Sequence, residues 1–577
     1  MSEIYQVVYP VGSPASKYKD VAPSLPDLNG KKIALLWNWA FRGDDTFPII
    51  EEELKARYPE IQVTSYEHYG NFHNPDPEKA AERMAAIPGM LKEEGIDAVI
   101  VGNGCCGTCS PVVARGVVMA ENCGIPAVGI LCKGFPTMAK ANAKGAGYPD
   151  ARMIEYPNPI AMDSIEQVRE NIHNVLMDRI IDALTKPVKS TVKKAKKKGP
   201  GSRDIVFEGS YDEIQKYFYG KNWSDGLPIV PPSVERVEEF LKFTDRDPEE
   251  EMGIMDPTKN VCTPWKVAVN GVMAGCRPEY MPILMSIADI MVDPEFHVKD
   301  SGATPGWEAM IMLNGPIRNE LEFNYKIGHQ RPDCKPNVTI GRFYRLMLKN
   351  IGGFYLGSTE MSSHGQMFRP VIPENDEVCD EIGFKTVGEL MGFEKGANVV
   401  SIVSGRCQSD PMQTNGSTAE QHLDYMVDWA TRMIEPYQTM RDYHENHVLF
   451  LSPVVAKRLA DAGYTKETIA RYILDHAKVT AEYFELNASR FNHWHPYSLK
   501  EEVEKGNLGP EWHESDDPKR MVPLFGKPAN IMIIVVGDPT RNRSQFFRSN
   551  LAMAKLTARE IKVPENWNSM LEEAKKK

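Results

Sequence analysis

An almost uninterrupted apolar run at residues 96–101 constrains the fold of this chain more than any other feature. A strand with one wet face alternates apolar and polar residues, whereas a strand buried on both faces is apolar throughout. The run is preceded by a helical pattern at 77–94, which ends at Gly95, and Ser110-Pro111 after it is typical of a helix start. The pattern therefore predicts a central strand of a parallel sheet covered by helices.

Strand and helix candidates alternate from residue 33 to residue 184. This order predicts an α/β fold with a doubly wound, flavodoxin-like parallel sheet, in which ligands bind beyond the carboxyl ends of the strands. The strand candidates are 33–37, 61–66, 96–101, 127–131 and 153–156, and the helix candidates are 47–58, 77–94, 110–123 and 164–184.

A lysine-rich segment at residues 186–203 divides the chain. Its first thirteen residues contain seven lysines, and Gly199-Pro200-Gly201-Ser202 follows them. Like charges repel and no apolar face is present, so we expect an extended, flexible linker, with a polyanion-binding patch as the alternative. The expected domains are a thiol-bearing α/β domain at 1–185, the linker at 186–203, and a larger α/β or α+β domain at 204–577.

The larger domain has a less regular pattern. Ser210 and Glu213 form a capping-box signature for a helix ending at Gly220, and Ser417 and Glu420 form a second one. Further helices are expected at 278–291, 339–350 and 417–434, strands at 398–403, 447–451 and 531–536, and a helix after the loop at 537–544.

Composition excludes several classes of protein. The formal net charge of −12 gives no basic excess for general nucleic-acid binding. No apolar run of about 18 residues predicts a membrane span, and no secretory signal is visible, so we expect a cytoplasmic protein. In a reducing compartment the five cysteines between Cys105 and Cys132 favour catalysis or metal binding over a structural bridge.

The motif Cys106-Gly107-Thr108-Cys109 lies between the predicted central strand and the following helix. A helix N-terminus lowers the pKa of a nearby thiol, so Cys106 is the candidate nucleophile and Cys109 the candidate resolving thiol. Cys105 adds a third candidate catalytic thiol. The alternative is an iron–sulfur cluster or zinc held by Cys105, Cys106 and Cys109, with Cys132 as a fourth ligand.

The stretch GNGCCGTCSP at residues 102–111 resembles the UGSC-motif (seleno)protein family. The resemblance places Cys106 at the selenocysteine position and Cys109 at the final cysteine, and implies mainly redox chemistry. The chain departs from the motif at Thr108, where serine is usual, and at Cys105, where an acidic residue is common. The second half resembles the family's usual partner domain at 223–228, 314–317, 337–353 and the loop near the C-terminus that contains a glycine and a serine.

Polar residues in the larger domain suggest an anion site. Arg541, Arg543 and Ser544 follow a predicted strand and precede the expected helix, so they could hold a carboxylate or phosphate. Arg318 and Asn314 lie in a Gly/Pro turn, where they could line a pocket or bond to loop carbonyls.

Histidines and tryptophans give three further candidates. His364, in a Ser-Ser-His-Gly loop, is a candidate general acid, with a hydrogen-bonded surface role as the alternative. The Asn-His-Trp-His stretch at 492–495 alternates two histidines but has no third metal ligand at a recognisable spacing. Trp37 and Trp39 end the first strand, where one of them could cover the sheet edge that carries the thiols.

These residues predict a thiol-dependent oxidoreductase that acts on a small organic, anionic substrate, with the active site between the two domains. An external thiol or a thioredoxin-like partner would reduce the Cys106–Cys109 disulfide formed in turnover. The first alternative is a redox-neutral cysteine-dependent lyase, hydratase or racemase, and the second is a metal or iron–sulfur protein. No cofactor, nucleic acid or membrane partner is predicted, and a homo-oligomer is compatible with the sequence.

Overall fold

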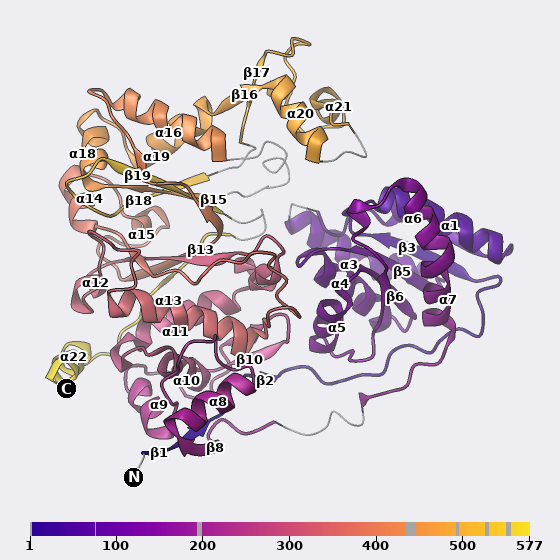
Figure 1. Ribbon diagram of the computed structural model, residues 1–577, viewed down its shortest axis with the longest axis horizontal. Helices are drawn as coiled ribbons and strands as arrows, with labels where there is room; N and C mark the ends of the chain where they lie inside the picture. The colour runs from indigo at the N-terminus through magenta and orange to yellow at the C-terminus, as the bar shows by residue number, and fades with distance from the viewer. Residues whose placement is uncertain are drawn as a thin grey trace.

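The computed structural model of the chain contains two α/β domains, which lie at the left and right of Figure 1. The smaller domain holds a five-stranded parallel sheet, and the larger one is built around an eight-stranded mixed sheet. This architecture confirms the predicted fold class. The structure describes residues 3–74, 77–192, 199–433, 446–491, 496–525, 530–549 and 555–576.

The small sheet has the strand order β4-β3-β5-β6-β7, and every neighbouring pair is parallel. Counted from the domain's own first strand, this is the flavodoxin-like order. The order reverses between β3 and β5, so the connections from these strands leave on opposite faces. The strands are β3 (Lys32–Trp37), β4 (Gln62–Thr64), β5 (Ala98–Gly104), β6 (Ala127–Cys132) and β7 (Arg152–Tyr156).

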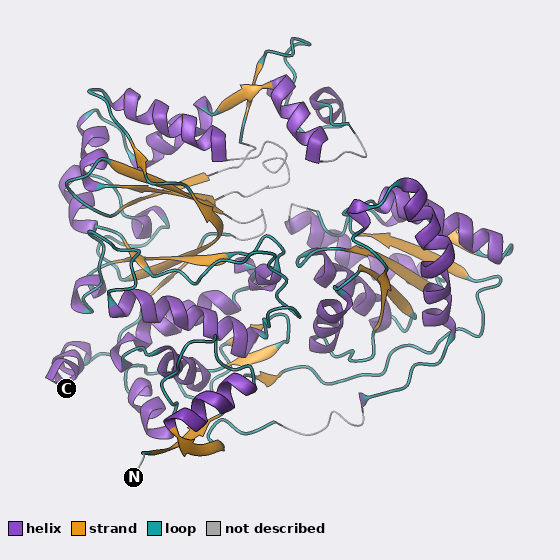
Figure 2. Cartoon of the chain, in the orientation of Figure 1, coloured by secondary structure: helices purple, strands orange, loops and turns teal. Residues whose placement is uncertain are grey.

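Helices cover both faces of the small sheet (Figure 2). One apolar core joins the sheet to α1, α6 and α7, and a second core joins its other face to α3, α4 and α5. Burial on both faces explains why all seven residues of β5 are buried. The helices are α1 (Gly43–Arg57), α2 (Tyr66–Tyr69), α3 (Pro77–Glu93), α4 (Cys109–Asn122), α5 (Pro136–Gly145), α6 (Ile165–Asn171) and α7 (Met177–Thr185).

Besides the short α2, helix α5 is a helix of this sandwich that the sequence pattern did not predict. It buries Met138, Ala139 and Ala143, and alternates them with lysine, asparagine and glycine. Small alanine side chains give little periodic apolar signal, so the helix is hard to recognise from its sequence.

The large sheet has the order β12-β11-β13-β19-β15-β18, with β14 beside β19 and β20 beside β13. It mixes parallel pairs, such as β15 with β18, and antiparallel pairs, such as β15 with β19. One core packs α10 (Pro264–Ala274), α11 (Met281–Val292) and α13 (Lys335–Met347) on β11 and β13. A second core packs α16 (Ala419–Met433), α18 (Pro453–Asp461) and α19 (Lys466–His476) on β15 and β18. The strands are β11 (Glu308–Asn314), β12 (Ile372–Pro373), β13 (Val399–Gln408), β14 (Met412–Gln413), β15 (Asn446–Leu451), β18 (Asn530–Val535), β19 (Arg543–Ser549) and β20 (Thr557–Glu560).

Most of the elements expected in the larger domain are present. Helix α8 (Tyr211–Gly220) begins with the predicted capping box of Ser210 and Glu213. The box expected at Ser417 is displaced by one residue, because Thr418 and Gln421 exchange the hydrogen bonds at the start of α16 (Ala419–Met433). The remaining helices of this domain include α9 (Val234–Leu241), α12 (Ile317–Glu320), α14 (Asp376–Ile382), α15 (Val387–Leu390), α18 (Pro453–Asp461), α19 (Lys466–His476), α20 (Ala481–Phe491), α21 (Leu499–Glu504) and α22 (Trp567–Lys576).

The N-terminal arm corrects the expected domain boundary at residue 1. Strand β1 (Ile4–Val8) pairs antiparallel with β8 (Ile205–Ser210) of the larger domain. Lys266 Nζ and Asn270 Nδ2 of α10 then donate hydrogen bonds to the carbonyl oxygens of Tyr9 and Pro10, at 2.5 and 3.2 Å. The start of the chain therefore belongs to the larger domain, and the chain enters the thiol-bearing domain after this arm.

The lysine-rich segment leads from the small domain back to the larger one. Residues 193–198 lie outside the described residues, so the flexibility of this linker stays a prediction. Among the residues that the structure describes, no helix is both long enough and apolar enough to cross a membrane.

Candidate active site

The thiol motif lies at the switch point of the small sheet. Cys106 follows β5, and the segment from Asn38 to Arg42 follows the neighbouring strand β3. In doubly wound sheets this crevice between oppositely directed connections is where ligands bind. The fold thus brings the CxxC motif to the edge that the sequence predicted for it.

The Cys106 sulfur is held by the first turn of α4. Its Sγ accepts a hydrogen bond from the backbone N–H of Cys109 at 3.1 Å, and the Thr108 hydroxyl lies 3.2 Å from it. The carbonyl oxygen of Cys106 accepts hydrogen bonds from the backbone N–H and the hydroxyl of Ser110. The helix start fixes both the backbone and the side chain of the candidate nucleophile.

These contacts favour the thiolate form of Cys106. Burial raises the pKa of the thiol, but hydrogen bonds from the side chains of Cys109 and Thr108 and from their backbone N–H groups lower it, to about 7. Donors that point at sulfur stabilise the charged form more than burial destabilises it. A substantial fraction of Cys106 is therefore thiolate near neutral pH.

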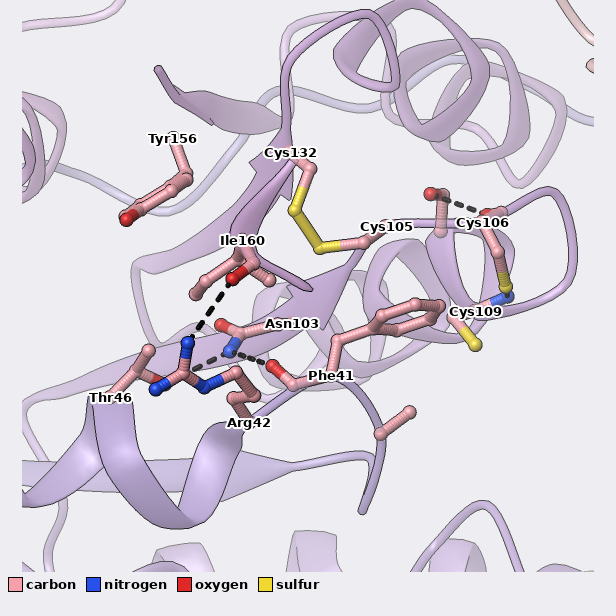
Figure 3. Close-up of a disulfide and its surroundings, with 12 residues drawn as sticks. Phe41, Arg42, Thr46, Asn103, Cys105, Cys106, Cys109, Cys132, Tyr156 and Ile160 are labelled. Carbon is pink, nitrogen blue, oxygen red and sulfur yellow. Dashed lines mark hydrogen bonds between the residues drawn. A yellow bond between two sulfur atoms is a disulfide. The ribbon is translucent and has the colours of Figure 1, made fainter. Parts of the chain in front are cut away.

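Cys105 has a different role from the one expected. Its sulfur forms a disulfide with Cys132 at the end of β6, and the Cα atoms of the two residues are 4.8 Å apart. Figure 3 shows this disulfide pointing away from the sulfurs of Cys106 and Cys109, neither of which is in a disulfide. The expectation that the whole cysteine cluster serves catalysis or metal binding is wrong for Cys105, because a disulfide sulfur is no free thiol.

The same disulfide argues against the alternative metal site. Cys105 and Cys132 would have been two of its four ligands, and their sulfurs bind each other. In the described ranges, no group of three or more histidine, cysteine, aspartate or glutamate residues is arranged to hold a metal ion. His493 and His495 lie outside the described residues.

The segment after β3 packs against the segment before the thiols. Asn38 Nδ2 donates to the carbonyl oxygen of Asn103 at 3.0 Å, and Asn103 Nδ2 donates to the carbonyl oxygen of Phe41 at 2.9 Å. In Figure 3 the Phe41 ring points toward Cys109. Phe41 and its neighbours Trp39 and Arg42 have φ angles of 54–57°, a costly conformation that clusters at functional sites. Phe41 is therefore a candidate wall of the thiol site.

The two tryptophans at this edge stack on each other. The ring centroids of Trp37 and Trp39 are 4.9 Å apart, and the Trp37 Nε1–H donates to the carbonyl oxygen of Ala40. Trp37 is buried, whereas Trp39 is 42% exposed. The two tryptophans lie at the switch point, because β3 ends at Trp37.

The thiol loop contacts the larger domain directly. A Cβ atom built on Gly107 would lie 1.8 Å from the carbonyl oxygen of Gly302, so the two backbones touch. A second contact brings Gly145, at the end of α5, against the carbonyl oxygen of Pro257. The expectation that the thiols face the second domain agrees with these contacts.

Charged residues line both sides of this contact. Arg115 lies on α4, and Lys299 and Asp300 belong to the 3₁₀ helix Val298–Gly302. Burial and the Arg115 charge lower the pKa of Lys299. Burial raises the pKa of Asp300, but the neighbouring His297 and the charges of Lys299 and Arg115 give it a net decrease. Charges from the two domains therefore act on each other across this interface.

A buried ionic network lies behind this segment. Arg345 Nη2 donates to Glu360 Oε1 at 2.6 Å, and Arg345 Nη1 is 3.6 Å from Glu308 Oε2. Burial raises the pKa of Glu308. Next to Glu360, the carbonyl oxygen of Thr359 lies 2.3 Å from a Cβ built on Gly302. The network thus supports the loop against which the thiol motif docks.

His364 lies in the same loop. The loop is tied to the interface segment by a hydrogen bond from Ser363 N to the carbonyl oxygen of Thr304, at 2.8 Å. The side chain of His364 is exposed. The loop of His364 lies at the domain interface, where a general acid would be needed. In the described residues, no contact joins His364 to Cys106.

Arg541, Arg543 and Ser544 do not form the expected helix N-terminus. The segment after the loop is strand β19, not a helix, so the predicted helix is wrong. Arg541 donates to the carbonyl oxygen of its neighbour Thr540, and Ser544 is buried. In Figure 1 this loop lies at the left edge of the larger domain, whereas the thiol-bearing domain lies at the right. These residues are not brought to the thiols.

Arg318 and Asn314 are parts of a buried structural network. Arg318 is 2% exposed and lies 3.2 Å from Asp376 Oδ2, and its Nη1 donates to the carbonyl oxygen of Glu374. Asn314 Nδ2 donates to the carboxylates of Glu374 and Asp376. With these partners, both residues satisfy buried groups of the turn, which was the alternative given for them.

The sequence pattern missed Arg115, Lys299, Glu308 and Arg345. Arg115 and Lys299 look like ordinary surface charges in the sequence, because their juxtaposition depends on the docking of two domains. Glu308 was the more recognisable residue, since it is a charged residue at the start of the apolar strand β11.

Comparison with known proteins supports the expected family. Residues 6–186 match the UGSC family. No curated protein and no solved structure matches the chain.

Proposed function

Residues 6–186 of the chain match the UGSC family. We propose that the protein is a thiol-dependent oxidoreductase that reduces a small organic substrate. The single observation that carries the proposal is the Cys106 sulfur, which accepts hydrogen bonds from the first turn of α4 and has a pKa of about 7. A thiolate of this kind is both abundant and nucleophilic at neutral pH.

The reaction consumes two thiols and reduces one bond of the substrate. The Cys106 thiolate attacks one atom of a two-electron-reducible bond, such as a disulfide or peroxide bond, and displaces the other atom as an anion. Cys109, deprotonated, then attacks Cys106 Sγ and releases the second part as an anion. The protons that the two thiols gave up to solvent neutralise the products, and a Cys106–Cys109 disulfide remains.

The resulting disulfide requires a reductant. An external thiol or a thioredoxin-like protein would transfer two electrons to it and restore both thiols. The disulfide of Cys105 and Cys132 stays outside this cycle, because its sulfurs point away from Cys106 and Cys109 (Figure 3).

The redox-neutral alternative has less support. Two-thiol racemases place one thiol on each face of the substrate. Here hydrogen bonding with the Cys109 side chain contributes to the low pKa of Cys106, so the two sulfurs are neighbours. Neighbouring thiols favour disulfide formation over proton transfer on two opposite faces.

The experiment follows the aromatic disulfide dithiobis-nitrobenzoate, whose coloured thiolate is counted by absorbance. The starting protein for this test carries Cys123→Ser, Cys334→Ser and Cys407→Ser, which remove the other partly exposed thiols. We expect two rapid equivalents of coloured thiolate per chain, one equivalent in Cys109→Ser with an adduct left on Cys106, and none in Cys106→Ser. A single equivalent with intact Cys109, or an unchanged reaction in Cys106→Ser, would refute the proposal.

A further inference from the structure

One face of helix α4 carries a cationic side chain toward the larger domain. Arg115 follows Thr108 by seven residues, so the two lie on the same face of the helix, about two turns apart. The N-terminal end of this helix is where Gly107 touches Gly302. The part of the larger domain that meets the thiol loop therefore also passes near Arg115.

The facing segment carries a second cation. Lys299 lies one 3₁₀ turn before Gly302, in the helix Val298–Gly302. The charge of Arg115 acts on both Lys299 and Asp300, which places the three groups in one electrostatic neighbourhood. Two like charges from different domains thus lie in one neighbourhood, along the helix that begins at the thiol motif.

The charges of this neighbourhood do not cancel. Lys259 and Asp256 form an ion pair with Nζ and Oδ1 2.8 Å apart and neutralise each other. The two positive charges of Arg115 and Lys299 then stand against the one negative charge of Asp300. This leaves one excess positive charge when His297 is taken as neutral. Among the described residues, neither the Arg115 guanidinium nor the Lys299 ammonium has a hydrogen bond or an ion pair. A pair of cations brought together without a partner is costly unless an anion joins them.

Unpartnered polar atoms add a second, independent observation. Ser301, between Asp300 and Gly302, is 1% exposed, and its hydroxyl has no hydrogen-bond partner in the described part of the chain. Asp300 Oδ2 and His297 Nδ1 are also buried without a hydrogen bond there, and they lie 3.6 Å from each other. Buried polar groups left in this way mark a place where a ligand or water completes the bonding.

We propose that Arg115 and Lys299, with the Ser301 hydroxyl, bind one anionic group of the substrate, a carboxylate, across the domain interface beside Cys106. This site rests on the proposed function, since it positions a substrate for the Cys106 thiolate. It also replaces the anion site that the sequence suggested at Arg541 and Arg543, which lies at the other side of the larger domain.

The experiment compares two small alkylating probes that differ in charge. Iodoacetate and iodoacetamide both react when the Cys106 thiolate displaces iodide and forms a carbon–sulfur bond, but only iodoacetate is an anion. Mass spectrometry of the Cys106 peptide gives both rates, and their ratio removes any change in the amount of thiolate. We expect the ratio of iodoacetate to iodoacetamide rates to fall about tenfold in Arg115→Gln and in Lys299→Gln, since a charge-assisted contact is lost.

Control variants separate this site from bulk charge. Lys140→Gln removes an exposed lysine from α5 of the same domain, and the ratio should stay within about twofold of the starting protein. Arg115→Lys keeps the charge and should retain most of the preference. An unchanged ratio in both Arg115→Gln and Lys299→Gln, with Cys106 still alkylated by iodoacetamide, would overturn the anion site and leave the proposed function standing. A Cys106 that iodoacetamide does not modify would overturn both.

Discussion

Gly107 and Gly302 approach each other so closely that neither domain has room for a side chain at their contact. A Cβ built on Gly107 would lie 1.8 Å from the Gly302 carbonyl oxygen, and one on Gly302 would lie 2.3 Å from the carbonyl oxygen of Thr359. The thiol loop, the 3₁₀ helix and the loop behind it are therefore stacked backbone on backbone. The position of Cys106 depends on this stack.

Gly107→Ala should separate the thiol loop from the larger domain. The added methyl group cannot be accommodated without movement of backbone, which costs about 1–3 kcal/mol in a packed site. We expect faster hydrogen exchange at residues 298–306 and a loss of the preference of Cys106 for iodoacetate. Gly89→Ala is the matched control, because nothing lies within 4 Å of a Cβ there. Identical behaviour of the two variants would contradict the contact.

Thr108→Val should shift the pH dependence of Cys106 alkylation. The reactive thiolate has a pKa of about 7, and the Thr108 hydroxyl is one of the groups that lower it. Removing that donor destabilises the thiolate, so the midpoint of the rate–pH curve should move up. A rise of about one unit would reduce the thiolate fraction at pH 7 from about one half to about one tenth.

Thr185→Val, which removes a hydroxyl from α7, should leave that midpoint at about 7. The lowered pKa of Cys106 also makes the stability of the fold depend on pH. The lowered pKa stabilises the folded state above the unfolded thiol value of about 8.5, and this contribution is lost as the pH falls through about 7. A midpoint that does not move in Thr108→Val would show that its hydroxyl does not act on Cys106.

Arg345→Met should destabilise the larger domain strongly. It leaves the buried carboxylates of Glu308 and Glu360 without their shared cation, and breaking a buried pair in this way costs about 3–5 kcal/mol. Urea unfolding measures the loss. Lys555→Met is the control, because its ion pair with Glu295 is exposed and contributes less than about 1 kcal/mol. Equal losses in the two variants would argue against the network.

Val7→Asp should unfold the larger domain although residue 7 precedes the thiol-bearing domain in the chain. Val7 is fully buried in the main core of the larger domain, and an unpaired carboxylate there costs several kcal/mol. Ile4→Asp changes the same strand at a position that is 56% exposed and should cost little. Thermal unfolding followed by hydrogen exchange assigns the loss to a domain. A loss confined to residues 30–185 would contradict the strand pairing.

The sequence was sufficient for the central strand of the small sheet and for the position of Cys106 and Cys109, because their signals are local. The apolar run that became β5 and the helix-start signal Ser110-Pro111 lie within a few residues of Cys106. Each predicts its own element, although the helix begins one residue earlier than Ser110, at Cys109. The capping box of Ser210 and Glu213 is local in the same sense. Such features need no knowledge of distant contacts.

Features that depend on distant contacts were missed or wrong. The bridge from Cys105 to Cys132 requires that β5 and β6 be neighbours, which the spacing of cysteines does not reveal. The loop before Arg543 has turn residues that suit a following strand as well as a following helix, and β19 is decided by its pairing with β15. Arg115 and Lys299 meet only after two domains have docked.

The pairing of β1 with β8 makes the thiol-bearing domain an insertion within the larger one. Ile4 pairs with Ser210, so strand β1 leaves the ribosome about 200 residues before its partner strand is made. At about 5–20 residues per second this is roughly 10 to 40 s, during which the inserted domain can fold alone. A single protease cut between the domains would also leave both fragments associated, because the N-terminal fragment carries a strand of the other one.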